Sequence, residues 1–170
     1  MASVPNHLPG GMAGLPGNRV SDEDVVIVDT WVKVWRDGIV PELSTKGLLG
    51  LAAALQRDDA RIITGATTSP PPLQCVSGRP VQGYCPLCYA LLDGEQPGTV
   101  SVGELEERFA AACWNADQRL GEPGVCRHLL NAIDDWTRPE LIRRLLPEVN
   151  RGLERRAVYT GGSPRTGHIG

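Results

Sequence analysis

Cysteine is the residue type in this sequence whose number and spacing could do chemistry. The chain holds five cysteines, at these positions: Cys75, Cys85, Cys88, Cys113 and Cys126. Two residues separate Cys85 from Cys88, and this spacing allows both thiolates to bind one zinc ion. Further along the chain, the sulfur of Cys126 and the imidazole of His128 are two positions apart. We therefore predict a structural Zn²⁺ site with four ligands, namely Cys85, Cys88, Cys126 and His128.

The second pair of ligands depends on where the helix after Gly124 begins. Side chains two residues apart inside a helix point about 200° apart. Cys126 and His128 therefore share one metal ion only if the helix starts at or after them. Cys113 is a poorer ligand candidate, because it falls on the apolar stripe of a predicted helix. Cys75 could replace either member of the second pair.

Two other interpretations of the cysteines stay open. An odd number of cysteines without a secretory signal argues against a disulfide framework, so packed free thiols are the plainer interpretation. A Cys-x-x-Cys pair at a helix start is also typical of thiol–disulfide enzymes, because the helix N-terminus favours the thiolate. In that case Cys85 is the nucleophile and Cys88 the resolving thiol. Such enzymes place a strand directly upstream within a βαβ unit, and residues 79–84 form a poor strand.

Other catalytic motifs are missing from the sequence. It has no phosphate-binding loop, no dinucleotide turn, no zinc-protease helix and no serine-nucleophile elbow. His128 is the plausible general base among the three histidines, since His7 and His168 fall in the glycine- and proline-rich ends. A structural role for His128 is the plainer interpretation. An enzyme is therefore the less favoured class, and we predict no catalytic residues.

Helices account for most of the remaining pattern. Apolar residues recur at three- and four-residue spacing, which is typical of amphipathic helices. The predicted helices cover residues 21–38, 44–57, 101–121, 125–136 and 138–156. We expect a mainly α fold, an irregular bundle of about five helices with a proline- and glycine-rich central loop region.

Particular residues set the expected ends and packing of these helices. Gly38 is the predicted stop of the first helix, and Trp31 and Trp35 are spaced as part of its core-facing stripe. Gly47 and Gly50 weaken the second helix by up to about 1 kcal/mol each relative to alanine, and small residues at that spacing favour close approach of another helix. Pro147 is expected to kink or split the last helix.

The domain organisation follows from the same pattern. Residues 1–20 are predicted to be a flexible N-terminal arm, residues 21–158 a single helical domain, and residues 159–170 a flexible C-terminal tail. Within the domain, residues 64–100 form a loop-rich segment that carries three of the five cysteines. Long loops in compact domains are uncommon, and a zinc ion would tether this one to the helices.

Charge and composition indicate the setting and the partners. Of seventeen basic residues, fifteen are arginine, which is typical of a high-GC bacterial genome. Neither a secretory signal nor an apolar span of about 18 residues is found, so we expect a cytoplasmic protein without a membrane partner. Residues 138–170 carry seven arginines and three glutamates. Nucleic-acid binding through this arginine-rich segment is a minor alternative to a solvated helix face.

These observations favour a small intracellular bacterial binding or accessory protein, with another protein as its partner. The structural zinc site would then hold its central loop. Two alternatives stay open: a Cys-x-x-Cys thiol–disulfide enzyme, and a metal-free scaffold subunit whose arms order in an assembly.

Overall fold

The computed structural model of the chain describes residues 30–73 and 76–161. In this part of the chain the fold is mainly α, as predicted. The helices are the π-helix η1 (Val34–Ile39), the 3₁₀ helix η2 (Val40–Glu42), α2 (Thr45–Gln56), α3 (Pro86–Ala90), α4 (Val102–Leu120), α5 (Cys126–Asp135) and α6 (Arg138–Gly161). Two short strands, β1 (Thr68–Ser69) and β2 (Gly83–Tyr84), pair antiparallel. The predicted N-terminal arm, the helix start at Ser21 and Cys75 lie outside the described residues.

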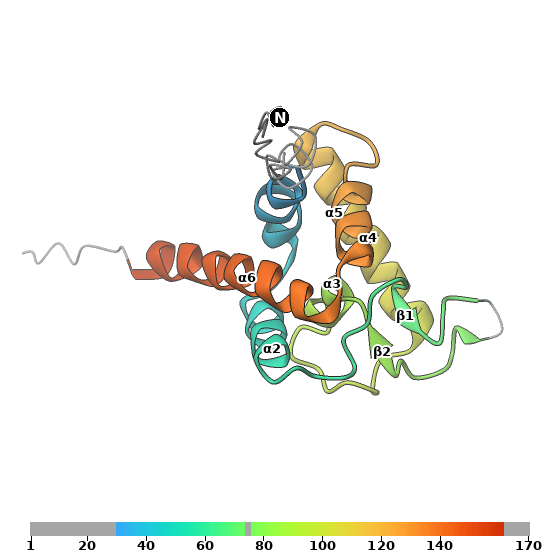
Figure 1. Cartoon of the computed structure of the whole chain (residues 1–170). Helices are drawn as coiled ribbons and strands as arrows, with labels where there is room; N and C mark the ends of the chain where they lie inside the picture. Colours follow the sequence, from blue (N-terminus) through green and yellow to red (C-terminus); the bar gives the residue numbers. More distant parts are fainter. Residues whose placement is uncertain (1–29, 74–75, 162–170) are drawn as a thin grey trace, which may run out of the picture.

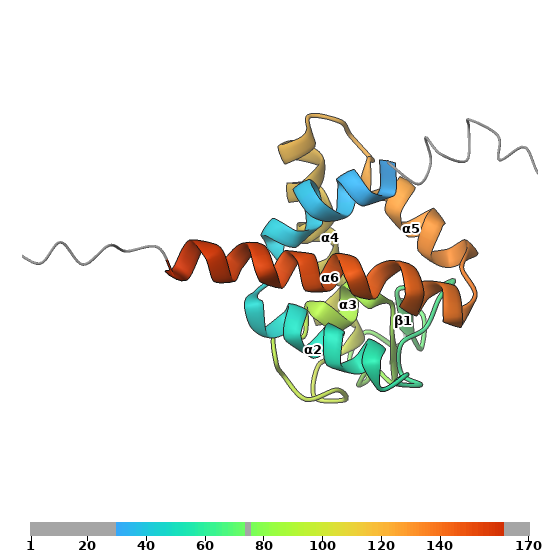
Figure 2. The same ribbon diagram turned by 60° about the vertical axis from the view of Figure 1, so that its left-hand side comes forward.

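The helices pack around one core in an irregular arrangement. α4 and α5 run side by side, and η1 packs against both of them (Figure 1). α6 lies across the molecule with α2 packed along it (Figure 2). The short helix α3 contacts both α2 and α4, so it joins the two halves of the bundle.

Every helix named above except η2 contributes fully buried side chains to the core. They include Trp35, Leu48, Leu87, Leu105, Leu129 and Leu145, each with no measurable exposure. The prediction that Trp31 and Trp35 are core residues is confirmed, with exposed fractions of 4% and 0%. The indole of Trp31 also meets that of Trp136 edge to face, with ring centroids 4.9 Å apart, a favoured aromatic geometry.

The prediction that the first helix stops at Gly38 is wrong. The helix continues through η1 and η2 to Glu42. Gly38 is buried against α4, where a Cβ would lie 2.9 Å from Cδ1 of Leu120 and 3.2 Å from Cβ of Ala116. Its missing side chain therefore serves close packing between helices. Gly121, in contrast, ends α4 as predicted, with a left-handed φ of 69°.

Side-chain hydrogen bonds cap the starts of three helices. The hydroxyl of Ser44 accepts the N–H of Gly47 at the start of α2 (2.9 Å), and Ser101 caps α4 in the same way. The carboxylate of Glu140 accepts both the N–H (3.0 Å) and the hydroxyl (2.8 Å) of Thr137 at the start of α6. These contacts satisfy donors that the first helical turn leaves without partners.

The last helix is longer than predicted and is not split. α6 runs without interruption through Pro147 and ends at Gly161, beyond the predicted end near Arg156. Pro147 and Arg143 are both exposed. Water can therefore bond the Arg143 carbonyl, which receives no N–H from the proline. This exposure explains why the helix tolerates a proline inside it.

The loop-rich segment is anchored by burial and by hydrogen bonds. Thr68 of β1 pairs with Tyr84 of β2. The Tyr84 side chain is fully buried, and its hydroxyl donates to the carbonyl of Val81 (2.9 Å) and accepts the N–H of Gly98 (2.7 Å). The segment is joined to the helices by the hydrogen bond from the Thr67 hydroxyl to the Glu106 carboxylate of α4 (2.5 Å) and by the packing of α3 on α2 and α4.

Candidate functional site

The structure distributes the four predicted zinc ligands over two helices. Cys85 is the N-cap residue of α3, Cys88 lies inside α3, and Cys126 is the first residue of α5. Cys126 is buried, whereas His128 is exposed, as the two-residue spacing inside a helix requires. Across residues 30–73 and 76–161, no group of three or more His, Cys, Asp and Glu side chains could hold a metal ion. The predicted ligand set is therefore not brought together.

Cys85 and Cys88 form the first of two cysteine pairs. The backbone N–H of Cys88 donates to Sγ of Cys85 (3.3 Å), and the two side chains are 4% and 0% exposed. The pKa of the Cys88 thiol is raised well above its ordinary value by its hydrogen bond to Cys85 and by burial. The neighbouring Glu106 carboxylate and Cys113 thiol raise the same pKa further. Cys88 is therefore a protonated, packed thiol at neutral pH.

Cys113 of α4 and Cys126 of α5 form the second pair. Sγ of Cys126 lies 3.5 Å from the carbonyl oxygen of Cys113, and the two thiols are close enough for each to shift the pKa of the other. This thiol contact lowers the pKa of Cys113 and, together with burial, raises that of Cys126. Cys113 is half-buried, whereas Cys126 is 4% exposed. In this pair Cys113 is the better nucleophile, and Cys126 holds the proton.

Asp117 fixes the geometry of the second pair. Its carboxylate accepts the N–H of Gly124 (2.6 Å) and the N–H of Cys126 (3.2 Å). An acidic side chain from α4 therefore satisfies free donors at the start of α5 and holds the two helices together there. Because Cys113 and Asp117 are four residues apart on α4, they lie on the same face. This contact keeps Cys126 beside Cys113.

The sequence reasoning missed both Cys113 as a partner of Cys126 and Asp117 as the residue that positions them. Cys113 was assigned to the apolar stripe of a predicted helix and was treated as a poorer ligand candidate. One signal was available. Asp117 lies one helical turn after Cys113 and shortly before the helix stop at Gly121. An acidic side chain at this position is compatible with a contact between the end of α4 and the start of α5.

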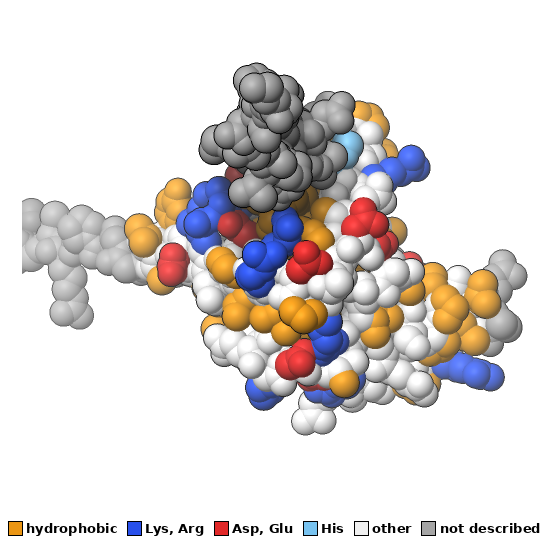
Figure 3. Space-filling model, viewed as in Figure 1, with side chains coloured by type: hydrophobic (Ala, Val, Ile, Leu, Met, Phe, Trp, Pro, Cys, Tyr) orange, Lys and Arg blue, Asp and Glu red, His pale blue; other side chains and the backbone are white. Residues whose placement is uncertain are grey.

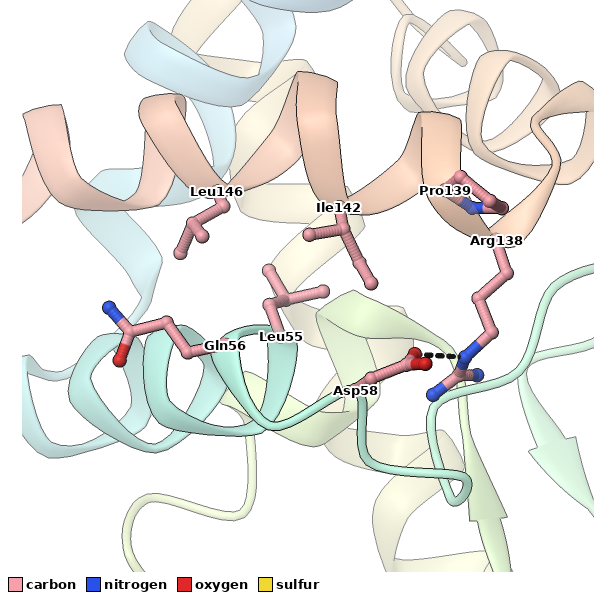
Figure 4. Close-up of a pocket in the computed structure, with 7 residues that line it drawn as sticks. All are labelled: Leu55, Gln56, Asp58, Arg138, Pro139, Ile142 and Leu146. Atoms are coloured by element: carbon pink, nitrogen blue, oxygen red, sulfur yellow. Dashed lines mark hydrogen bonds and ion pairs between the residues drawn. The ribbon is translucent and has the colours of Figure 1, made fainter.

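A second candidate site is a groove between α2 and α6, with a volume of about 480 Å³. Its lining residues are Leu55, Gln56, Asp58, Arg138, Pro139, Ile142 and Leu146 (Figure 4). Leu55 points up from α2 toward Ile142 and Leu146 of α6. None of the described cysteines lines this groove.

One end of the groove is polar and held firmly. The Arg138 guanidinium forms an ion pair with Asp58 and donates to the carbonyl of Ile62 (2.8 Å). The Asp58 carboxylate is thereby compensated, so the wall near it carries no uncompensated negative charge. The groove thus combines an apolar floor with one fixed polar end, a combination that is common in binding sites.

Comparison with known proteins gives no relative: no family model, no curated protein and no solved structure matches the chain. No helix in the described part of the chain is long and apolar enough to cross a membrane.

Proposed function

We propose that this chain is a non-enzymatic, intracellular binding or accessory protein that docks an amphipathic, acidic segment of a partner protein in the groove between α2 and α6. The observation that supports this most directly is the groove itself, which is apolar along its floor and open to solvent. Hydrophobic side chains are visible along the line where α6 crosses α2 (Figure 3).

The shape of the apolar surface suits a helical segment. Ile142 and Leu146 are one helical turn apart and only partly buried. On the facing helix α2, Leu49 is 54% exposed. It lies two turns before the lining residue Gln56, so Leu49 and Gln56 lie on the same face of α2. Apolar side chains three or four residues apart on a partner helix would fill this groove in the helix-in-groove mode of recognition.

The charge at the rim favours an acidic partner segment. Arg57 and Arg143 are exposed next to the lining residues Gln56 and Ile142. A nearby carboxylate, that of Asp58, is already bound by Arg138. Acidic side chains on the partner would therefore meet positive charge, which speeds encounter and selects against basic segments.

The cysteines support a structural rather than catalytic role. Cys85, Cys88 and Cys126 are at most 4% exposed, so a substrate outside the protein does not reach their sulfurs. Zinc stays a prediction of the sequence, and the metal content of the purified chain measures it. About one zinc ion per chain, lost in the variant Cys85→Ser, would support the metal tether. Metal-free protein in which Cys85 is alkylated rapidly at about pH 6 would favour the thiol enzyme instead.

A photoreactive residue in the groove tests the binding proposal. We would place a photo-crosslinking amino acid at Gln56, which lines the groove, in the full chain expressed in cells. Gln82 is an equally exposed control position in the loop-rich segment, away from α2 and α6. We expect a crosslinked adduct from position 56 and none from position 82. Adding Leu146→Gln should abolish the adduct while the circular dichroism spectrum stays that of a folded helical protein.

The sequence of the crosslinked segment decides the outcome. Apolar residues at three- and four-residue spacing with several Asp or Glu residues would support the proposal. A crosslink between two copies of this chain would show that the groove binds a second copy of the chain, and it would reject a different protein as the partner. Equal adducts from positions 56 and 82, or an adduct that survives Leu146→Gln, would reject the groove as the binding site.

A further inference from the structure

We propose that Cys113 and Cys126 form a redox modification site, which a small-molecule disulfide such as oxidised glutathione converts into a disulfide bond between α4 and α5. This inference does not depend on the proposed binding function. It rests on the contact between the two thiols, on their unequal exposure and on the contact that holds them together.

The contact already exists in the reduced protein. Sγ of Cys126 lies against both the backbone carbonyl (3.5 Å) and the thiol of Cys113. The Asp117 carboxylate fixes the start of α5 on α4 through the N–H groups of Gly124 and Cys126. The two sulfurs are therefore held together by structure that does not depend on the thiols themselves.

The unequal exposure assigns a role to each thiol. Cys113 is half-buried on α4 and open to a reagent from solvent, whereas Cys126 is 4% exposed. Cys113 thus meets the incoming disulfide, and Cys126 attacks only after the first bond has formed.

The chemistry is a thiol–disulfide exchange in two steps. The Cys113 thiolate attacks one sulfur of the small disulfide, whose S–S bond breaks and releases one thiolate. The Cys126 thiol gives its proton to that thiolate or to water, then attacks Sγ of Cys113 and expels the second small thiol. The two cysteines are oxidised, and one small disulfide is reduced to two thiols.

The Cys85–Cys88 pair supplies an internal control. Both of its sulfurs are paired as well, but they are buried at the start of α3, with exposed fractions of 4% and 0%. A reagent in solvent reaches them only if that region opens. The same oxidant should therefore leave Cys85 and Cys88 reduced while the second pair reacts.

The test treats the reduced full chain with oxidised glutathione at neutral pH and maps the disulfides by mass spectrometry after tryptic digestion. Cleavage after arginine places Cys113 in peptide 109–119 and Cys126 in peptide 120–127, whereas Cys85 and Cys88 fall together with Cys75 in peptide 62–108. We expect the first two peptides to be joined by a disulfide that dithiothreitol removes. Within the third peptide, fragment ions locate each cysteine, and Cys85 and Cys88 should both be free thiols.

Two variants separate the steps. Cys126→Ser should stop at a mixed disulfide between glutathione and Cys113, and Cys113→Ser should leave Cys126 unmodified. Cys85→Ser, the matched control, should still form the bond between the other two cysteines.

Other results would overturn the proposal. A disulfide between Cys85 and Cys88, with Cys113 and Cys126 still reduced, would show that the proposal names the wrong pair. Failure of wild type to join peptides 109–119 and 120–127 would refute the proposal without any variant. Bound zinc that protects Cys113 and Cys126 until a chelator removes it would show that the pair serves a metal instead.

Discussion

Gly47 of α2 offers a sharp test of the packing between α2 and α3. A Cβ at this position would lie 2.0 Å from the carbonyl oxygen of Ala90, at the end of α3. Gly50, one turn further along the same helix, has no atom within 4 Å of its Cβ position. The substitutions Gly47→Ala and Gly50→Ala therefore make the same chemical change in the same helix with opposite steric consequences.

The magnitudes follow from two opposing effects. Replacing glycine by alanine inside a helix stabilises the folded state by about 1 kcal/mol. Forcing extra atoms into a packed core costs about 1 to 3 kcal/mol. The upper end applies at Gly47, because the opposing atom belongs to the backbone of Ala90 and does not rotate away. We expect Gly47→Ala to lower the free energy of unfolding by about 2 kcal/mol, and Gly50→Ala to raise it by up to about 1 kcal/mol.

Urea denaturation followed by circular dichroism measures both variants against the wild type. The slope of the unfolding free energy with urea should stay unchanged, since the surface exposed on unfolding is the same. The combined difference of about 3 kcal/mol corresponds to melting temperatures about 6 to 12 °C apart for a chain of this length. A Gly47→Ala variant as stable as Gly50→Ala would refute the close approach of α2 to α3.

Three ion pairs give further predictions. The Arg61 side chain hydrogen-bonds the Asp59 carboxylate and, despite opposing burial, holds its pKa at about 2, below the unfolded value of about 3.9. The stability that this pair supplies is present above about pH 4 and is lost as pH falls toward 2, so the deficit of Asp59→Asn should shrink over that range. A deficit that stays constant in urea titrations from pH 5 to 2 would contradict this. Glu148 is 7% exposed and accepts two hydrogen bonds from Arg36 (2.5 and 2.8 Å); Glu148→Gln should lower the unfolding free energy by about 1 to 2 kcal/mol. Asp37→Asn, in an exposed pair at 4.0 Å, should change it by less than about 0.5 kcal/mol, and equal losses in both variants would show that burial of the pair is unimportant.

The helices and their ends were largely predictable because their signals are local. Ser44, Ser101 and Thr137 cap helices through bonds to residues three positions away, and the apolar stripes repeat within a few turns. Trp31 and Trp35 lie in the core as their spacing predicted. Each of these features depends on residues that are neighbours in the sequence as well as in space.

Three glycines show where such local signals fail to predict the structure. Gly38 has the residue type of a helix stop, yet the helix continues because α4 packs where its side chain would be. Gly47 and Gly50 looked equivalent in the sequence, and only Gly47 meets another helix closely. The difference between them is set by Ala90, more than forty residues away in the chain.

The cysteines follow the same division. The sequence by itself determined that Cys85 and Cys88 are neighbours at a helix start, because only two residues separate them in the chain. Only the tertiary structure decided that Cys126 lies against Cys113 rather than beside His128. The direction of a helical side chain follows from the helix start, while its partner depends on how α4 and α5 pack, and that packing comes from burial summed over the whole core.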